Sequence, residues 1–424
     1  MARTLTPVDG YAIVTQMVRQ ATGQDSYAAV NASTFVSAGE TILSTGMENT
    51  YNAINMVLSR LVVGVRAYRG KMATVQAADT GVYTHRVRKV SYYAKDALPS
   101  GYFNTDLYTN LADGYTSGDN GGASTKSQWE QHQAMPLEMN FAGSTTWQDC
   151  ITQYEEQVKM AFDSINDFLR FVEGYLQEHA NDIESQKEAW RRLAVLSKMA
   201  SIYDYAINES VMTESAVNLT AAYNAKFNPS PALTTQDLLT TYLKEFTQFA
   251  IATIKTYSNR LTNRSARFHL PMTKTVGGVN YNILRHTPKA DQRLILYGPL
   301  ITDIEAQVMP EIFGPDYMKL GQNFETVDYW QTEDGTNDMG INFQTAIYDT
   351  VTGAQKQGAV VSLDHVVGIL FDRDAVLTDF QLELAHTTPI EARKGYRNTW
   401  LTFAKNVIND PTENAILFYM EDTP

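Results

Sequence analysis

The residue types that perform catalysis or hold cofactors form no recognised motif in this sequence. The chain has no G-x-G-x-x-G, no G-x-x-x-x-G-K-[ST], no H-E-x-x-H and no G-x-S-x-G pattern. Gly353 and Gly358 have the glycine spacing of a phosphate-binding loop, but Ala359 stands where the lysine is needed. No two of the seven histidines are three or four positions apart, so none share a helix face. The sequence therefore predicts no catalytic residue, no metal site and no cofactor.

A site assembled in three dimensions from dispersed carboxylates is the alternative. Asp364, His365, Asp372 and Asp374 are of the types used in general acid–base catalysis, although capping of turns and pairing with arginines is the interpretation we favour. Cys150 is the only cysteine, which excludes an intrachain disulfide and a cysteine-based zinc site. We interpret it as a small buried apolar residue. An enzyme with a glycine-rich lid is thus one alternative to a structural protein.

Basic residues gather on one segment, where they alternate with β-forming residues. Val82–Tyr93 (VYTHRVRKVSYY) predicts a strand, and Met135–Phe141 predicts its returning partner in a two-stranded ribbon. About forty residues rich in Gly, Ser, Asn and Asp separate the two strands. The basic residues of this segment are Arg86, Arg88, Lys89 and Lys95.

Such a ribbon needs support from another surface. Connections of this length are rare inside compact domains and signal function or disorder, and an isolated hairpin is marginally stable in water. We expect the ribbon to lie on an acidic surface of a neighbouring chain, because opposite charges set the register and association rate of an interface. The acidic residues predicted to receive it, on a long helix after the ribbon, are Asp149, Glu155, Glu156 and Asp163.

The composition is that of a globular protein. A chain of 424 residues suits two or three domains of ~150 residues, and 44% hydrophobic with 19% charged residues is enough to build a packed core. The net charge of −13, without a long basic run, argues against sequence-specific nucleic-acid binding. No apolar stretch reaches the ~18 residues of a membrane helix, and residues 1–7 lack the apolar core of a signal peptide. We therefore expect production in a reducing cytoplasm.

Apolar spacing predicts several helices. One long amphipathic helix is expected from residue 145 to 176, with Thr145 and Gln148, or Thr146 and Asp149, as its capping box. A second helix is expected over 190–203, and Thr234 with Asp237 predicts the start of another. Further elements are expected as a helix at 48–60, a strand at 292–297, a helix at 301–309 and a strand at 324–330.

The last sixty-odd residues contain two buried-strand patterns around a polar turn. Val360–Ala375 is apolar and ends in a charged corner, Asp-Arg-Asp. Further on, the apolar stretches 400–407 and 416–419 flank the turn 409–414 (NDPTEN). Proline fixes φ and Asx residues favour tight turns, so this pattern predicts a hairpin.

This order of an apolar strand, an FDRDA corner, an RKGYRN lead-in and a segment ending in ENAILFYM resembles the C-terminal part of the peripheral domain in major capsid proteins of tailed bacteriophages. That family has the Hong Kong 97 fold. The likeness is clearest over 360–420, and a weaker likeness in element order covers most of the chain. It implies an α+β fold with an N-terminal arm, an extended β-hairpin loop, a long spine helix, a peripheral domain and an axial domain. The implied divisions are 1–79 (arm and first helix), 80–142 (extended loop), 143–210 (spine helix and helical part of the peripheral domain), 211–355 (axial domain) and 356–424 (C-terminal strands and hairpin of the peripheral domain).

The resemblance also implies the function and the partners. Copies of the chain are expected to form hexamers and pentamers of an icosahedral phage head, which encloses double-stranded DNA without sequence-specific binding and involves no membrane. The N-terminal stretch is too short for a large scaffolding segment, so we expect a separate scaffolding protein, together with a portal. The expected location is the virion capsid, after assembly in the host cytoplasm. A second alternative is another virion structural protein, such as a tail or baseplate component.

Overall fold

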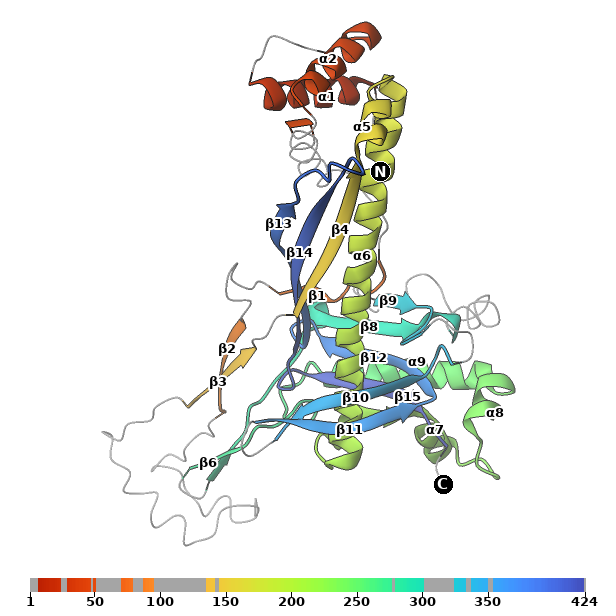
Figure 1. The fold of residues 1–424 in the computed structure, drawn as a ribbon. Helices are drawn as coiled ribbons and strands as arrows, with labels where there is room; N and C mark the ends of the chain where they lie inside the picture. The colour runs from red at the N-terminus through yellow and green to blue at the C-terminus, as the bar shows by residue number, and fades with distance from the viewer. Residues whose placement is uncertain are drawn as a thin grey trace, which may run out of the picture.

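A long helix joins two parts of this protein. The computed structural model describes residues 7–23, 29–46, 49–50, 70–78, 87–94, 135–141, 145–276, 279–300, 324–332, 337–349 and 354–422. A small helical head lies at one end of helix α6 and a broader body of sheets and helices at the other (Figure 1). Within the described ranges, no helix is both long and apolar enough to cross a membrane.

Helix α6 (Ile165–Tyr203) is the spine of the molecule. Its 39 residues give a length of about 58 Å at 1.5 Å per residue. The helix starts at Ser164, whose side chain accepts a hydrogen bond from the Asp167 backbone N–H at 3.1 Å. A π-helical turn, Asp204–Asn208, continues its last turn. One long helix therefore follows the ribbon and strand β4, and the helix predicted over 190–203 is its C-terminal part.

The predicted start of that helix is wrong. Residues Thr145–Tyr154 form strand β4, followed by the short helix α5 (Glu155–Ala161). All ten residues of β4 pair with strand β14 (Tyr396–Asn409), from Tyr154 opposite Tyr396 to Thr145 opposite Lys405. Threonines and aromatic residues fill this stretch and suit a pleated surface, so cross-strand pairing outweighs the helical spacing of its apolar residues.

Strand β4 is the edge of a four-stranded sheet that lies along the spine helix. The order is β1 (Gln76–Ala77), β13 (Val376–Thr387), β14 and β4, with β1 parallel to β13 and the other pairs antiparallel. On the face toward the helix, the Phe403 ring centroid lies 5.3 Å from that of Trp147 and 4.9 Å from that of Phe380, and Lys187 of α6 lies over the Phe380 ring at 5.6 Å. Trp190 of α6 donates a hydrogen bond to the Asn406 carbonyl at 3.0 Å.

A five-stranded sheet forms the centre of the body. Its order is β5 (Ala216–Asn218), β15 (Ala415–Met420), β12 (His365–Asp372), β8 (Gln292–Tyr297) and β9 (Phe324–Val327). Alternate residues of its strands face opposite sides, as the period of two requires. Leu417 and Tyr419 pack with the spine helix, whereas Ile416 and Phe418 pack with helices α7 (Leu219–Phe227) and α9 (Leu243–Arg260).

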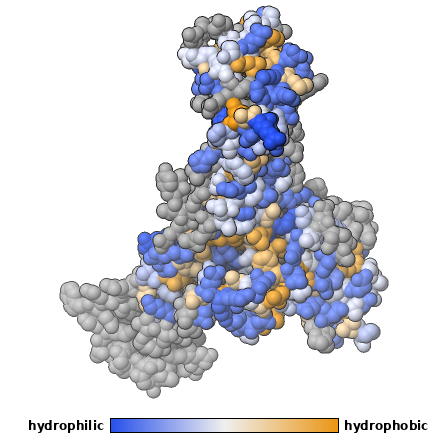
Figure 2. All heavy atoms as spheres, viewed as in Figure 1, coloured by the Kyte–Doolittle hydropathy of each residue, from blue (hydrophilic) through white to orange (hydrophobic). Residues whose placement is uncertain are grey.

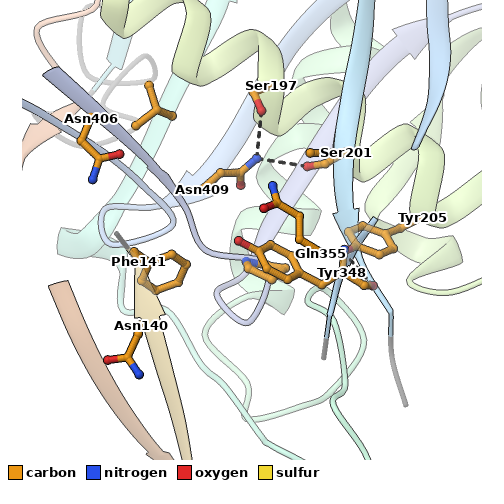
Figure 3. Close-up of a pocket in the computed structure, with 12 residues that line it drawn as sticks. Asn140, Phe141, Ser197, Ser201, Tyr205, Tyr348, Gln355, Asn406 and Asn409 are labelled. Carbon is orange, nitrogen blue, oxygen red and sulfur yellow. Dashed lines mark hydrogen bonds between the residues drawn. The ribbon is translucent and has the colours of Figure 1, made fainter. Parts of the chain in front are cut away.

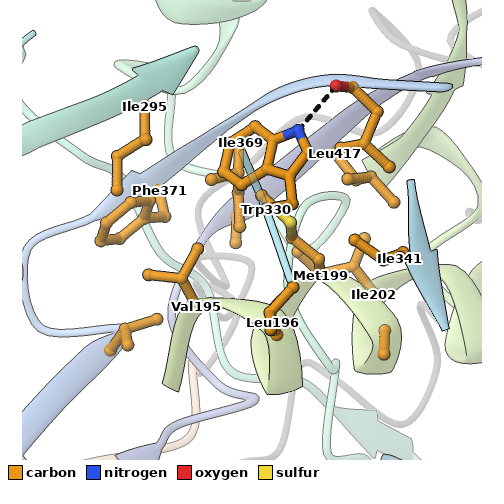
Figure 4. Close-up of a cluster of buried hydrophobic side chains, with 14 of the residues drawn as sticks. Val195, Leu196, Met199, Ile202, Ile295, Trp330, Ile341, Ile369, Phe371 and Leu417 are labelled. Carbon is orange, nitrogen blue, oxygen red and sulfur yellow. Dashed lines mark hydrogen bonds between the residues drawn. The ribbon is translucent and has the colours of Figure 1, made fainter. Parts of the chain in front are cut away.

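The core on the spine side is built around Trp330. Its ring is fully buried against side chains of α6 such as Met199 and of the central sheet such as Ile369 (Figure 4). Its Nε1–H donates to the Val366 carbonyl at 2.8 Å, so the one polar atom of the ring is satisfied.

The predicted C-terminal hairpin does not form. Strand β14 pairs with β13 and β4, whereas β15 pairs with β12 and β5, so the two arms belong to different sheets. The 409–414 turn is a buried connection between these sheets. A local pattern of strand, turn and strand cannot distinguish this arrangement from a hairpin, because partners far away in sequence decide it.

The remaining elements complete the head, the body and the ribbon. The head comprises α1 (Pro7–Thr22) and α2 (Ala32–Ser44), which pack on α5 and the start of α6 around the stacked rings of Phe162 and Phe168. Figure 2 shows apolar patches on this head and at the junction between the body and the part formed by the spine helix and the four-stranded sheet. The other elements are α8 (Thr235–Thr240), β6 (Lys274–Val276), β7 (Val279–Tyr281), β10 (Ile341–Tyr348), β11 (Gln355–Leu363), the ribbon strands β2 (Val87–Tyr92) and β3 (Pro136–Phe141), and the 3-10 turns Thr213–Ser215 and Lys289–Asp291.

Several sequence predictions are confirmed at this level. The ribbon pairs antiparallel as expected, the strand predicted over 292–297 is β8, and the Thr234–Asp237 capping box opens α8. The expected strand at 360–375 is divided between β11 and β12, which belong to different sheets. Of the helices predicted over 48–60 and 301–309, only residues 49–50 are among the described residues, and these two are helical.

Candidate functional site at the base of the ribbon

The ribbon has an inward and an outward face. Strands β2 and β3 are paired from Val87 opposite Phe141 to Tyr92 opposite Pro136. In β2, positions 87, 89 and 91 face the body, and positions 88, 90 and 92 are exposed. The ribbon projects from the side of the body (Figure 1). Only its inward face is therefore available to its own chain over these residues.

Lys89 anchors the inward face in the body. Its Nζ forms ion pairs with Asp410 and Glu413, both in the turn that connects β14 and β15. Arg285 reaches the same turn, with its Nε 3.3 Å from Glu413 Oε1 and 3.1 Å from the Thr412 carbonyl oxygen. The same guanidinium donates to Ser91 Oγ at 2.6 Å, so it contacts both the ribbon and the turn.

The turn owes its shape to its own side chains and to neighbouring backbone. Asp410 Oδ1 accepts from the Thr412 N–H at 2.8 Å and from its hydroxyl at 2.7 Å, which is an Asx turn. The Pro411 carbonyl accepts from the Leu270 N–H at 2.8 Å, and the Ala415 N–H donates to the Phe268 carbonyl at 2.9 Å. Residues 410–414 are buried, so their polar groups depend on these partners.

Lys198 brings the spine helix into the same cluster. Its side chain is buried, and Nζ donates to the Asp410 carbonyl at 2.6 Å. Burial lowers the pKa of Lys198 to about 8, although the negative charges of Asp410 and Glu413 oppose this shift. Burial tends to raise the pKa of Asp410, but the charge and hydrogen bond of Lys89 outweigh it, and the pKa is lowered. Asp410 is therefore the ionised centre of the cluster.

A chain of buried polar side chains extends from the turn into the body. His269 Nε2 lies 2.9 Å from the Ile283 carbonyl, which can only accept, so this nitrogen carries a hydrogen. His269 Nδ1 lies 3.0 Å from the Asn414 side-chain amide, which in turn bonds Thr287 Oγ1 at 3.2 Å. Thr287 donates to Asp372 at 2.8 Å. Burial lowers the pKa of His269 and raises that of Asp372.

A polar cavity of about 380 Å³ lies beside the anchor. Carboxamides and hydroxyls line it, and none of its lining residues is charged. Asn409 points into it and donates to Ser197 and Ser201 of the spine helix at 3.4 Å each, as Figure 3 shows. Asn140 and Phe141 of the ribbon form the facing wall, so the cavity separates ribbon, helix and turn.

The structure separates the predicted basic residues. Arg88 lies on the outward face, where its guanidinium pairs with Glu138 across the ribbon at 2.7 Å. Lys89 lies on the opposite face and has the intramolecular partners described above, so its role between subunits remains a prediction. Arg86 and Lys95 lie outside the described residues. The strand period of two explains why Arg88 and Lys89 cannot form one patch.

The predicted acidic residues do not lie on one long helix. Asp149 is in strand β4, Glu155 and Glu156 are in α5, and Asp163 precedes α6. Glu156 and Asp163 are exposed, and Glu155 pairs with Lys159 at 2.6 Å. Their helical grouping is wrong because residues 145–154 pair with β14.

The dispersed carboxylate site of the enzyme alternative does not assemble. Asp364 and His365 lie at one end of β12 and Asp372 at the other, about 23 Å away at 3.3 Å per residue. Among the described residues, no group of three or more His, Cys, Asp or Glu side chains is placed to hold a metal ion.

The sequence predictions missed most of the anchor. The sequence predictions assign no site role to Lys198, Arg285, Asp410 or Glu413. The polar residues concentrated between two strongly apolar strands could have indicated that a polar site forms at this turn. The charged groups of a turn that is buried between two strands need partners, because an unpaired buried charge is costly.

Comparisons with known proteins agree with this architecture. No curated protein matches the sequence. A chain in the capsid structure of Staphylococcus phage Andhra matches at 11% identity and a TM-score of 0.50, over 84% of this chain and 86% of that chain. A chain in the structure of the head fibre and inner core protein gp22 of native bacteriophage P68 matches at 11% identity and a TM-score of 0.49, over 84% and 86%. The predicted α+β capsid fold is confirmed.

The sequence itself carries the family signal. The model of the Phi29-like phage major capsid protein family matches residues 130–419, which is more than half of the chain. The match includes the returning strand β3, the spine helix, the buried turn, and the strands of both sheets except β1 and the last residue of β15. This chain therefore belongs to the family of Phi29-like phage major capsid proteins.

Proposed function

We propose that copies of this capsid protein assemble into hexamers and pentamers of an icosahedral head, and that the ribbon of each copy lies on a neighbour. The observation that carries this proposal is the two-faced ribbon. Its inward face is bound to its own body through Lys89 and Ser91, whereas Arg88, Val90 and Tyr92 face outward. Val90 is 47% exposed and Tyr92 60% exposed.

The anchor gives the ribbon a fixed base. A two-stranded ribbon is marginally stable alone, so its position depends on whatever holds it. Lys89 and Arg285 tie it to a turn that also holds the spine helix and connects two sheets. A ribbon fixed at its base presents its outward face in a defined direction, which reduces the entropy lost when it binds a neighbour.

The proposed receiving surface is acidic. Glu155 and Glu156 lie in α5, which packs with the head, Asp163 precedes α6, and Asp149 lies in the middle of strand β4. Basic residues of the ribbon, Arg88 together with Arg86 and Lys95, complement these charges between subunits. Each contact is modest, and closed symmetry multiplies it over many copies.

The remaining assignments follow from this role. The shell encloses double-stranded DNA without sequence-specific binding, in keeping with the net charge of −13. A separate scaffolding protein and a portal are the further partners, the site of assembly is the host cytoplasm, and the chain has no catalytic activity. The five divisions implied by the resemblance are retained as the functional parts of the subunit.

Charge reversal on the ribbon tests the proposal. The variant R86E/R88E should remain folded by circular dichroism but form no shells in negative-stain images. A matched control, R264E/R267E, makes the same change in net charge at two exposed arginines of the body. Normal shells from R86E/R88E would contradict the proposed contact. A small defined oligomer from the wild-type chain would instead favour a different virion component or an enzyme.

A further inference from the structure

One face of the four-stranded sheet carries no formal charge between β4 and β14. The spine helix covers the other face, on which Arg397, Thr399 and Phe403 are buried. On the face away from the helix, Trp400 is 40% exposed and Tyr154 47% exposed. We name this surface the uncharged face. It consists of the cross-strand pairs Tyr396–Tyr154, Asn398–Thr152, Trp400–Cys150, Thr402–Gln148 and Ala404–Thr146, of which Ala404 is itself fully buried.

Polar side chains on the uncharged face are paired with one another. Thr152 donates to the Asn398 side chain at 2.8 Å, and Gln148 donates to Thr402 Oγ1 at 3.3 Å. The main cost of burying a polar atom is the loss of its hydrogen-bond partner. These groups keep their partners when the face is covered. The aromatic rings gain from being covered, because burial of apolar area contributes roughly 25 cal/mol per Å².

The absence of charge on these ten positions suits contact with another copy of the same chain. Each copy has a net charge of −13, so two copies repel each other overall. An uncharged face with Trp and Tyr has the composition typical of the centre of an interface. Five pairs along two strands cover a strip about 27 Å long at ~6.8 Å per pair. This strip would supply part of the ~800 Å² that each partner of a stable contact buries.

We propose that the uncharged face is buried against a second copy of this chain in the assembled shell, with Trp400 at its centre. This inference rests on the proposed assembly function and adds a surface distinct from the ribbon contact. The chain provides its own reporter, because Cys150 is its only cysteine and lies opposite Trp400 on this face.

Thiol labelling measures whether the face is covered. Free subunits and shells are treated with the same maleimide at the same pH, and the modified fraction is followed by mass spectrometry. Cys150 should react at least tenfold more slowly in shells than in subunits. Shells dissociated in denaturant should regain full labelling, which shows that assembly caused the protection. Equal labelling rates in subunits and shells would overturn the inference and leave the proposed assembly intact.

A pair of variants checks the same surface independently of the thiol. W400D places a charge at the centre of the face and should prevent shell formation in a subunit that remains folded, whereas W400F should still form shells. Normal shells from W400D would overturn the inference. If the wild type itself forms no shells, both the proposed assembly and this surface are wrong.

Discussion

Lys89, on the projecting ribbon, forms an ion pair with Glu413 in the buried turn that connects the two sheets of the subunit. The two residues are 324 positions apart in sequence. Through this contact and the neighbouring Asp410, the base of the ribbon, the spine helix and both sheets share one polar cluster. The direction of the ribbon therefore depends on the integrity of the subunit core.

Replacing Lys89 should destabilise the isolated subunit more than replacing its neighbour. K89M keeps an apolar side chain of similar length but removes the positive charge that pairs with Asp410 and Glu413. Because one partner of a largely buried ion pair is lost, the free energy of unfolding should fall by about 2–3 kcal/mol. R88A removes an exposed pair and should cost below about 1 kcal/mol. Urea unfolding of both variants gives the comparison. Equal losses would contradict the anchor.

Lys198 should make stability depend on alkaline pH. Its pKa is about 8 in the folded protein, whereas a lysine in an unfolded chain titrates near 10.4. Between these values the unfolded state binds more protons, so the free energy of unfolding rises with pH, by an amount on the order of 3 kcal/mol. K198M should lack this increase. Denaturation curves from pH 7.5 to 10.5 give the free energy of unfolding of the wild type and of K198M. In the difference between the two values, the contributions of the other titrating groups cancel. Parallel pH profiles would contradict the assignment.

His269 should produce a destabilisation at acid pH. Burial lowers its pKa, so the unfolded state takes up a proton at a higher pH than the folded state does. The hydrogen bonds to the Ile283 carbonyl and the Asn414 side chain favour the charged form, as does Asp410 to a smaller extent, whereas Arg285 opposes it; burial outweighs the groups that favour it. As the pH falls below about 6.5, the wild type should lose stability relative to H269Q, which cannot titrate. Unfolding at pH 4 to 8 tests this. A difference that does not vary with pH would count against a buried neutral imidazole.

Gly368 should tolerate no side chain. It lies in β12 between β15 and β8, and an added Cβ would lie 2.3 Å from Leu296 Cδ2 and 2.6 Å from the Ile295 carbonyl oxygen. G368A should therefore cost about 3 kcal/mol through overpacking in the central sheet. G298A is the control, because a Cβ at residue 298 would lie 3.2 Å from its nearest neighbour, the Val327 carbonyl oxygen. Thermal unfolding of both variants should show the larger loss for G368A.

Local patterns in the sequence predicted elements whose stability is local. The helix predicted over residues 190–203, the Thr234–Asp237 cap and the pairing of the ribbon strands are confirmed. Residues 145–154 are predicted as helix but form strand β4, because the spacing of their apolar residues also fits a helix. Only their pairing with residues 396–405 decides between helix and strand.

The candidate site was harder to predict for the same reason. The alternation of β2 shows that Arg88 and Lys89 face opposite sides, but not which side faces the body. Lys89, Lys198 and Arg285 meet at one turn only in the folded chain, and no spacing in the sequence brings them together. The resemblance in residues 360–420 indicates the fold correctly, although the hairpin predicted from the same residues is wrong.

The contact between the ribbon and a neighbouring subunit is tested most directly by zero-length cross-linking in shells of mixed isotope composition. Subunits grown on ¹⁴N and ¹⁵N are assembled together and treated with a carbodiimide, which joins lysines to carboxylates in contact. We predict cross-linked peptides of mixed isotope composition that join the ribbon segment with Lys95 to the segment with Asp149, Glu155, Glu156 and Asp163. Cross-links of that ribbon segment found only within one isotope, in intact shells, would contradict the account.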